Sequence, residues 1–194
     1  MQIQAFILAG GQSRRMGTDK SRLRINNQTF TDKIAAALLP LTESVTLVGA
    51  HQQHAGFQSV PDVYPMWGAL GGLHAALANC RREWALVVAC DLPFVTEELF
   101  NFLAPLRAHY DAVVPLQPDN RPQPLSALYR VEPCLQRATE LIQAGQRRPL
   151  DLLELVNTRW VPFSDLTNLD QAERFFANIN TPDDYEAATM RELD

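Results

Sequence analysis

The chain has 194 residues, 46% of them hydrophobic, a formal net charge of −5 and a sequence pI of about 5.4. This apolar fraction is enough for one core, so we expect a single domain over residues 1–194. The acidic balance argues against nucleic acid as a partner. Residues 1–4 lack the charged start of a signal peptide, and no apolar run is long enough to cross a bilayer. We therefore expect a cytoplasmic protein with no membrane partner.

Short apolar runs alternate with helical patterns along the chain. Strands buried on both faces are predicted at residues 5–9, 45–48, 85–89 and 112–115. Helices are predicted at residues 32–39, 70–80, 96–103 and 133–144, and a last one follows Thr181 and Pro182. Thr96 is the expected N-cap of the third helix, and Gly145 the expected end of the fourth.

This alternation predicts an α/β fold with a doubly wound, mostly parallel sheet and helices on both faces. In such sheets, ligands bind beyond the carboxyl ends of the strands. Gly10 and Asp91 each follow a predicted strand. We therefore expect the functional site at the edge of the sheet that these two residues share.

Residues 10–20 combine glycines and cations directly after the first predicted strand. Gly10 and Gly11 have no β-carbon, so the backbone there can turn sharply and bring its N–H groups to an anion. Arg14, Arg15 and Lys20 add positive charge suited to a polyphosphate. The spacing fits neither the Walker loop nor the dinucleotide fingerprint. The alternative is a glycine turn beside a solvated basic face.

Two aspartates are candidate ligands. Asp91 ends a buried apolar run, where a carboxylate can hold Mg²⁺ together with substrate phosphates; a helix N-cap or a loop hydrogen bond is the alternative. Asp62 follows Pro61, and its carboxylate can accept hydrogen bonds from the N–H groups of a ligand, unless it is only a turn residue. Trp67 and Trp160 could stack on an aromatic ligand, although packing is the simpler role for each.

One long motif carries a family resemblance, and it reads Leu8-Ala9-Gly10-Gly11-x-Ser13-x-Arg15-Met16-Gly17-x-Asp19-Lys20. It resembles the signature of the molybdenum cofactor guanylyltransferases, within the nucleotidyltransferases that are similar to sugar-nucleotide pyrophosphorylases. The resemblance continues through residues 60–62, 71–73, 90–93, 124–129, 145–148 and 178–182, and so covers nearly the whole chain. It implies a Rossmann-like nucleotidyltransferase fold.

The resemblance also implies roles for particular residues. GTP would be bound by Leu8, Ala9, Gly10, Gly11, Lys20, Gly49, Asp62 and Asp91, with Asp91 as the Mg²⁺ ligand and Lys20, Arg15 and Asp91 as catalytic residues. Arg147, Arg148, Asn178 and Asn180 would lie on the side that receives the pterin. The chain departs from the family in two places, with Ala69 where proline is usual and no asparagine at 47–50. A backbone contact from Gly49 would replace the missing asparagine.

The implied reaction transfers GMP from GTP to the terminal phosphate of molybdopterin carrying molybdenum. The products are the molybdopterin guanine dinucleotide cofactor and pyrophosphate. Molybdopterin-loading proteins and molybdoenzyme chaperones would be protein partners. Cytidylyl transfer to the pterin and nucleotidyl transfer to a sugar phosphate are alternatives in the same class. A non-catalytic nucleotide or cofactor carrier is the alternative of another class.

Overall fold

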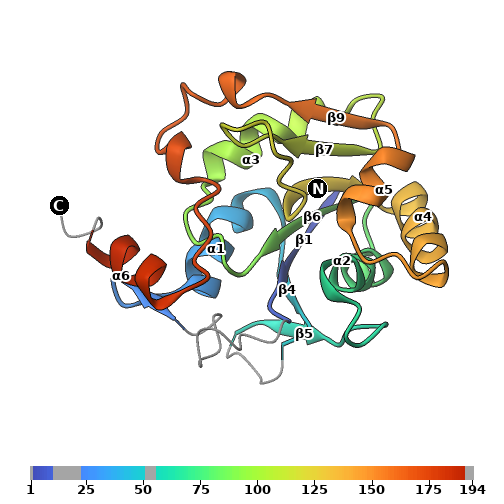
Figure 1. Cartoon of the computed structure of the whole chain (residues 1–194), viewed down its shortest axis with the longest axis horizontal. Helices are drawn as coiled ribbons and strands as arrows, with labels where there is room; N and C mark the ends of the chain where they lie inside the picture. The colour runs from blue at the N-terminus through green and yellow to red at the C-terminus, as the bar shows by residue number, and fades with distance from the viewer. Residues whose placement is uncertain (1, 11–22, 51–55, 191–194) are drawn as a thin grey trace.

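The structure, a computed structural model, describes residues 2–10, 23–50 and 56–190. Its centre is a seven-stranded sheet in the order β5-β4-β1-β6-β8-β7-β9 (Figure 1). The strands are β1 (Ile3–Leu8), β4 (Val45–Val48), β5 (Gln58–Val60), β6 (Trp84–Ala89), β7 (Ala112–Pro115), β8 (Ser126–Arg130) and β9 (Thr158–Val161). A separate two-stranded hairpin consists of β2 (Arg24–Ile25) and β3 (Gln28–Thr29).

The sheet is mostly parallel. β1 pairs in parallel with β4 and β6, and Ile7 of β1 lies between Leu47 and Val88 in register. β4 and β5 are parallel, as are β7 and β9. β8 runs antiparallel to both of its neighbours, β6 and β7. The predicted α/β class with a mostly parallel sheet is therefore confirmed, while β5, β8 and β9 were not predicted.

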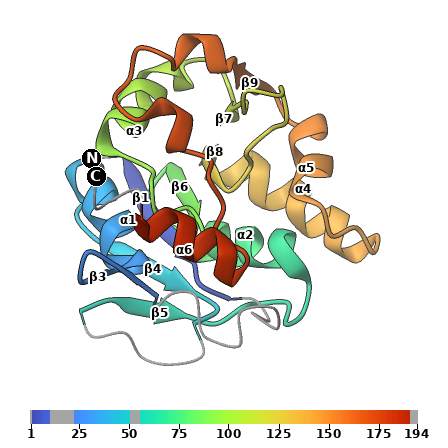
Figure 2. The same ribbon diagram turned by 60° about the vertical axis from the view of Figure 1, so that its left-hand side comes forward.

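Helices cover both faces of the sheet. α1 (Phe30–Leu38) and α3 (Glu97–Leu103) pack on one face, and α2 (Gly68–Asn79), α4 (Val131–Gln143) and α5 (Pro149–Leu155) pack on the other. Short 3-10 helices lie at Leu39–Leu41, Ala104–Arg107, Phe163–Asp165 and Ala172–Arg174. The last helix, α6 (Pro182–Met190), lies beside α1 and the β2–β3 hairpin (Figure 2).

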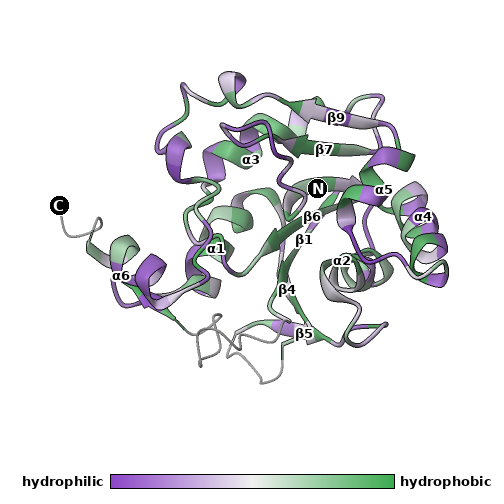
Figure 3. Ribbon diagram, in the orientation of Figure 1, coloured by the Kyte–Doolittle hydropathy of each residue, from purple (hydrophilic) through white to green (hydrophobic). Residues whose placement is uncertain are grey.

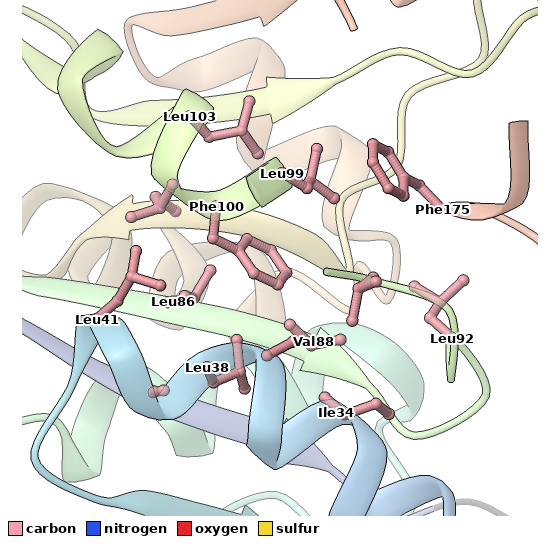
Figure 4. Packing of buried hydrophobic residues seen from close by; sticks show 14 of the residues in the cluster. Ile34, Leu38, Leu41, Leu86, Val88, Leu92, Leu99, Phe100, Leu103 and Phe175 are labelled. Atoms are coloured by element: carbon pink, nitrogen blue, oxygen red, sulfur yellow. The ribbon is translucent and has the colours of Figure 1, made fainter. Parts of the chain in front are cut away.

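The continuous apolar strands follow from this layering. In β1, Ala5 and Ile7 face the α1–α3 layer, whereas Phe6 and Leu8 face the α2–α4 layer. Figure 3 shows the resulting hydrophobic centre of the sheet. In Figure 4, the side chains of α1, β6 and α3 meet in the first layer. Full burial of one such Leu or Phe contributes roughly 1.5–3 kcal/mol.

Local sequence sets several helix ends. Thr29 and Asp32 form a capping box, so α1 begins two residues earlier than predicted. Thr96 caps α3 as predicted. α4 ends in a Schellman motif, in which Gly145 has φ +82° and Gln146 N–H donates to the Leu141 carbonyl over 2.9 Å. No helix in residues 2–10, 23–50 and 56–190 has the length and apolar character to cross a membrane.

Candidate active site

Four predicted site residues follow four neighbouring strands. In spatial order, Asp62 follows β5, Gly49 follows β4, Gly10 follows β1 and Asp91 follows β6. Because these strands are all parallel, their carboxyl ends lie at one edge of the sheet. Residues from four separate parts of the sequence therefore line a single edge.

Gly10, Gly49 and Asp62 are in close contact. A β-carbon on Gly49 would lie 3.0 Å from the Gly10 Cα and 3.2 Å from each carboxylate oxygen of Asp62. Gly49 also has φ +69°, a conformation that favours glycine. Gly10 is exposed, and Gly49 and Asp62 are half-buried. The missing side chains leave the Asp62 carboxylate beside bare backbone that a ligand can approach closely.

The backbone of this cluster is held by the sheet. The N–H groups of Ala9 and Gly10 both donate to the Val48 carbonyl, over 2.9 and 3.0 Å, and Gly49 N–H donates to the Val60 carbonyl over 2.9 Å. The expectation that the Gly10 amide faces an anion is therefore wrong, because that amide completes the β1–β4 pairing. Gly10 contributes space instead, and a backbone contact from Gly49 would come from its carbonyl.

Asp91 is fixed by contacts on both sides. The preceding Cys90 N–H donates to the Leu8 carbonyl over 3.1 Å, and the Asp91 carbonyl accepts from Ile179 N–H over 3.0 Å. Ile179 lies between Asn178 and Asn180, which are both exposed. The structure thus brings the two predicted pterin-side asparagines next to the predicted metal ligand, although 87 residues separate Asp91 from Asn178 in the sequence.

Phe94 anchors the loop that follows Asp91. The Arg174 guanidinium lies 4.1 Å from its ring centroid and the Lys33 ammonium lies 5.6 Å from it. The ring is 6% exposed. Such contacts add to the stability of the packed ring. They connect the Asp91 loop to α1 and to the segment before Asn178, a role that the sequence analysis did not identify.

The predicted arginine pair lies on the other side of the site edge, in the turn between α4 and α5. The Arg147 guanidinium lies 4.7 Å from the centroid of the Trp67 ring, and Trp67 Nε1 donates to the Gln146 carbonyl over 2.8 Å. The Arg148 side chain is 71% exposed, and its Nε lies 4.0 Å from Asp151 Oδ1. The structure therefore joins the arginine turn to residues 68–73, a second glycine-rich segment that forms the start of α2 and is called the second glycine loop below.

Close packing requires glycine at position 71 of that loop, whereas position 72 has more space. A β-carbon on Gly71 would lie 2.7 Å from the Trp67 Cβ and 3.1 Å from the Tyr64 carbonyl oxygen. A β-carbon on Gly72 would lie 3.4 Å from a methyl carbon of Leu8, an ordinary van der Waals contact. Leu8 and Ala9 are themselves buried. Leu8 and Ala9 therefore lie below the site and support Gly10.

A buried histidine of α2 connects this helix to α4. His74 Nε2 lies 3.1 Å from Thr139 Oγ1, and the Thr139 hydroxyl donates to the Leu135 carbonyl over 2.8 Å. The hydroxyl oxygen therefore accepts from His74 Nε2–H, which leaves Nδ1 as the unprotonated nitrogen. Nδ1 is buried and makes no hydrogen bond within the described residues. Burial lowers the pKa of His74, so the ring is neutral.

The remaining candidates lie outside the described residues. Gly11, Arg15 and Lys20 are among residues 11–22. Among residues 2–10, 23–50 and 56–190, no group of three or more His, Cys, Asp or Glu side chains is placed to hold a metal.

The sheet order and the glycine–aspartate edge define the class of nucleotidyltransferases with a Rossmann-like fold. A solved cytidylyltransferase of that fold, 2-C-methyl-D-erythritol 4-phosphate cytidylyltransferase from Thermus thermophilus, superposes with a TM-score of 0.71 over 100% of both chains at 16% identity. Within this class, the sequence profile described as the MobA-like NTP transferase domain matches residues 5–158. The chain belongs to this family.

Relatives match over nearly the whole length. A probable molybdenum cofactor guanylyltransferase of Pelotomaculum thermopropionicum is 34% identical, over 98% of this chain and 93% of its own. A molybdenum cofactor guanylyltransferase of Vibrio campbellii is 31% identical, over 94% and 93%. Among solved structures, molybdopterin-guanine dinucleotide biosynthesis protein A of Archaeoglobus fulgidus has a TM-score of 0.83 and 27% identity, and covers 98% of each chain.

Proposed function

We propose that this chain transfers GMP from GTP to the terminal phosphate of molybdopterin that carries molybdenum. The observation that carries the proposal is the contact of Gly10, Gly49 and Asp62 at the edge that also holds Asp91. The names of the full-length relatives support guanylyl transfer in particular. One nucleotidyltransferase domain over residues 1–194 would carry out the reaction.

Recognition of guanine would use acceptors. The N1–H and N2–H groups of guanine are donors, and the Asp62 carboxylate and the Gly49 carbonyl are acceptors that lie side by side. A base that lacks these two donors would lose hydrogen bonds to the acceptors, at a cost of roughly 0.5–1.5 kcal/mol each, or about 1.5–3 kcal/mol where the acceptor is charged. This difference is the basis of the preference that we expect for GTP.

Mg²⁺ is the proposed cofactor, and Asp91 would hold it. A carboxylate is the hard oxygen ligand that Mg²⁺ requires, and one or two carboxylates are sufficient when substrate phosphates and water complete the shell. A metal bound there would neutralise negative charge on the triphosphate. Cys90 N–H and the Asp91 carbonyl are both engaged in backbone hydrogen bonds, so the loop that carries the carboxylate is fixed before substrate binds.

The acceptor would bind between two groups of residues. Asn178 and Asn180 lie beside Asp91 through the Ile179 hydrogen bond, and Arg147 and Arg148 lie beside the second glycine loop. Arginine suits a phosphate because its planar donors can form two parallel hydrogen bonds. Arg15 and Lys20 would add charge along the triphosphate.

In the reaction, an oxygen of the molybdopterin phosphate attacks the α-phosphorus of GTP. The bond from the α-phosphorus to the bridging oxygen breaks, and pyrophosphate leaves with that electron pair. The enzyme needs no covalent nucleophile for this step, because alignment and charge stabilisation suffice. We place the reaction in the cytoplasm, with molybdopterin-loading proteins and molybdoenzyme chaperones as partners.

Two measurements test the proposal. In a thermal-shift panel of GTP, CTP, UTP and ATP with Mg²⁺, GTP should raise the melting temperature most, because a specific ligand stabilises the folded state. Pyrophosphate should then be released only when molybdenum-loaded molybdopterin is added with GTP. A larger shift with CTP would indicate cytidylyl transfer. A GTP shift without pyrophosphate release would indicate a carrier.

A further inference from the structure

We infer that Trp67 is a positioning residue that holds the arginine turn of residues 145–148 in place for the acceptor substrate. This inference deepens the proposed function and rests on it for the identity of the acceptor. Trp67 itself needs no contact with substrate. It acts by fixing the backbone at Gln146 and the side chain of Arg147.

The backbone of the turn starts in the Schellman motif of α4, but its side chains are exposed. Gly145, Gln146, Arg147 and Arg148 are all exposed, and they follow a helix end where Gly145 adopts φ +82°. An exposed turn with two long cationic side chains has many accessible conformations. Ordering these side chains upon binding an anion costs affinity, unless the free protein already holds them.

Trp67 supplies that order through two different contacts. Its Nε1–H donates to the Gln146 carbonyl over 2.8 Å, which fixes the backbone of the turn. Its ring lies 4.7 Å from the Arg147 guanidinium, a cation–π contact that fixes the side chain. Both contacts come from one indole. Replacing Trp67 with leucine removes both contacts, whereas replacing it with phenylalanine removes only the hydrogen bond.

Trp67 is rigidly placed. It precedes α2 directly, and its N–H donates to the Tyr64 carbonyl over 3.3 Å. Gly71 lies against it so closely that a β-carbon there would be 2.7 Å from the Trp67 Cβ. The first turn of α2 therefore packs against the Trp67 side chain and fixes its position.

A second contact between the same helices sets the register. His74 on α2 meets Thr139 on α4 at 3.1 Å, and Trp67 meets Gln146 at 2.8 Å. His74 lies seven residues after Trp67, and Thr139 lies seven residues before Gln146. The two contacts are therefore equally spaced along α2 and α4, which run in opposite directions. The Trp67 contact thus extends the α2–α4 interface to the site edge.

Variants at Trp67 separate positioning from general stability. Trp67→Phe keeps an aromatic face for Arg147 but loses the donor, and Trp67→Leu loses both. Trp160→Phe on β9 is the matched control, because the structure packs this partly buried tryptophan against the α2–α4 layer, the simpler of the two roles expected for it. Hydrogen exchange at residues 145–148, measured without any substrate, should rise in the order wild type, Trp67→Phe, Trp67→Leu, and should not change in Trp160→Phe.

Steady-state kinetics give the functional readout. With molybdenum-loaded molybdopterin as the varied substrate, Trp67→Leu should raise KM about tenfold, because it removes one hydrogen bond and one cation–π contact. Trp67→Phe should restore part of the loss, and the KM for GTP should stay within about twofold. Trp160→Phe should change neither constant.

Two results would overturn the inference. The first is unchanged hydrogen exchange at residues 145–148 in Trp67→Leu, or in Trp67→Phe if the leucine variant fails to fold. The second is an equal rise of KM for both substrates. If wild-type protein transfers no guanylyl group, the proposed function fails, and the exchange comparison still decides whether Trp67 holds the turn.

Discussion

The carboxylate of Asp62 lies where a side chain on Gly49 would have to be. A β-carbon on Gly49 would be 3.2 Å from both carboxylate oxygens, and the backbone of Gly49 has φ +69°. Both the limited space and the left-handed backbone conformation therefore require glycine at position 49. The family often has an asparagine in the segment that corresponds to residues 47–50.

Gly49→Ala should weaken both the fold and GTP binding. The left-handed backbone costs an L-residue about 1–2 kcal/mol, and the methyl group also displaces Asp62. The control is Gly56→Ala, because Gly56 has φ +91° but a β-carbon there meets no atom of the described residues within 4 Å. Urea unfolding should show the larger loss for Gly49→Ala. Calorimetry should show weaker GTP binding for that variant alone, and equal affinities would contradict the role of this contact.

Asp91→Asn should keep the fold and lose most Mg²⁺-dependent turnover. Asparagine has the same shape but lacks the negative charge that binds the cation, so we expect a decrease on the order of a hundredfold. Asp165→Asn is the matched control, because Asp165 is exposed in a 3-10 helix. Pyrophosphate release is measured at several Mg²⁺ concentrations. A near wild-type rate in Asp91→Asn would show that another residue holds the metal.

Lys20→Ala should reduce kcat by on the order of a hundredfold, comparable to the loss of one electrostatic donor. Negative charge moves to the leaving oxygen as pyrophosphate departs, and a flexible ammonium can follow it. An interaction that strengthens in the transition state affects kcat more than binding. Titrating GTP separates the two constants. A normal kcat with a raised KM would show that Lys20 contributes to GTP binding and not to catalysis. Lys20 lies outside the described residues.

The protein should lose stability as the pH falls below about 6.5 because of His74. Burial lowers the pKa of His74 in the folded state. Near pH 6.5, the imidazole therefore binds a proton in the unfolded chain but not in the folded chain. The free energy of unfolding should therefore decrease with pH by at most about 1.4 kcal/mol per unit for this group. His74→Leu should reduce this pH dependence. Urea unfolding of the wild type and the variant at pH 5–8 measures it.

The sequence predicted most helix ends that are set by capping residues nearby in the chain. Thr96 and Thr181 were recognisable as caps, and Gly145 as a helix end, because each acts on backbone groups a few residues away. β8 was missed although it is buried. Its direction is set by pairing with β6 and β7, which no residue within Ser126–Arg130 specifies.

The sequence by itself determined the class of fold and the places of Gly10 and Asp91 after two strands of the sheet, since a strand buried on both faces must be apolar. Only the tertiary structure decided how these parts meet. It placed Gly49 against Asp62, committed the Gly10 amide to the sheet, joined Ile179 to Asp91 and set Arg147 on Trp67. Each of these contacts joins segments far apart in the chain. Their geometry follows from strand order and helix packing, which depend on all the residues of the core together.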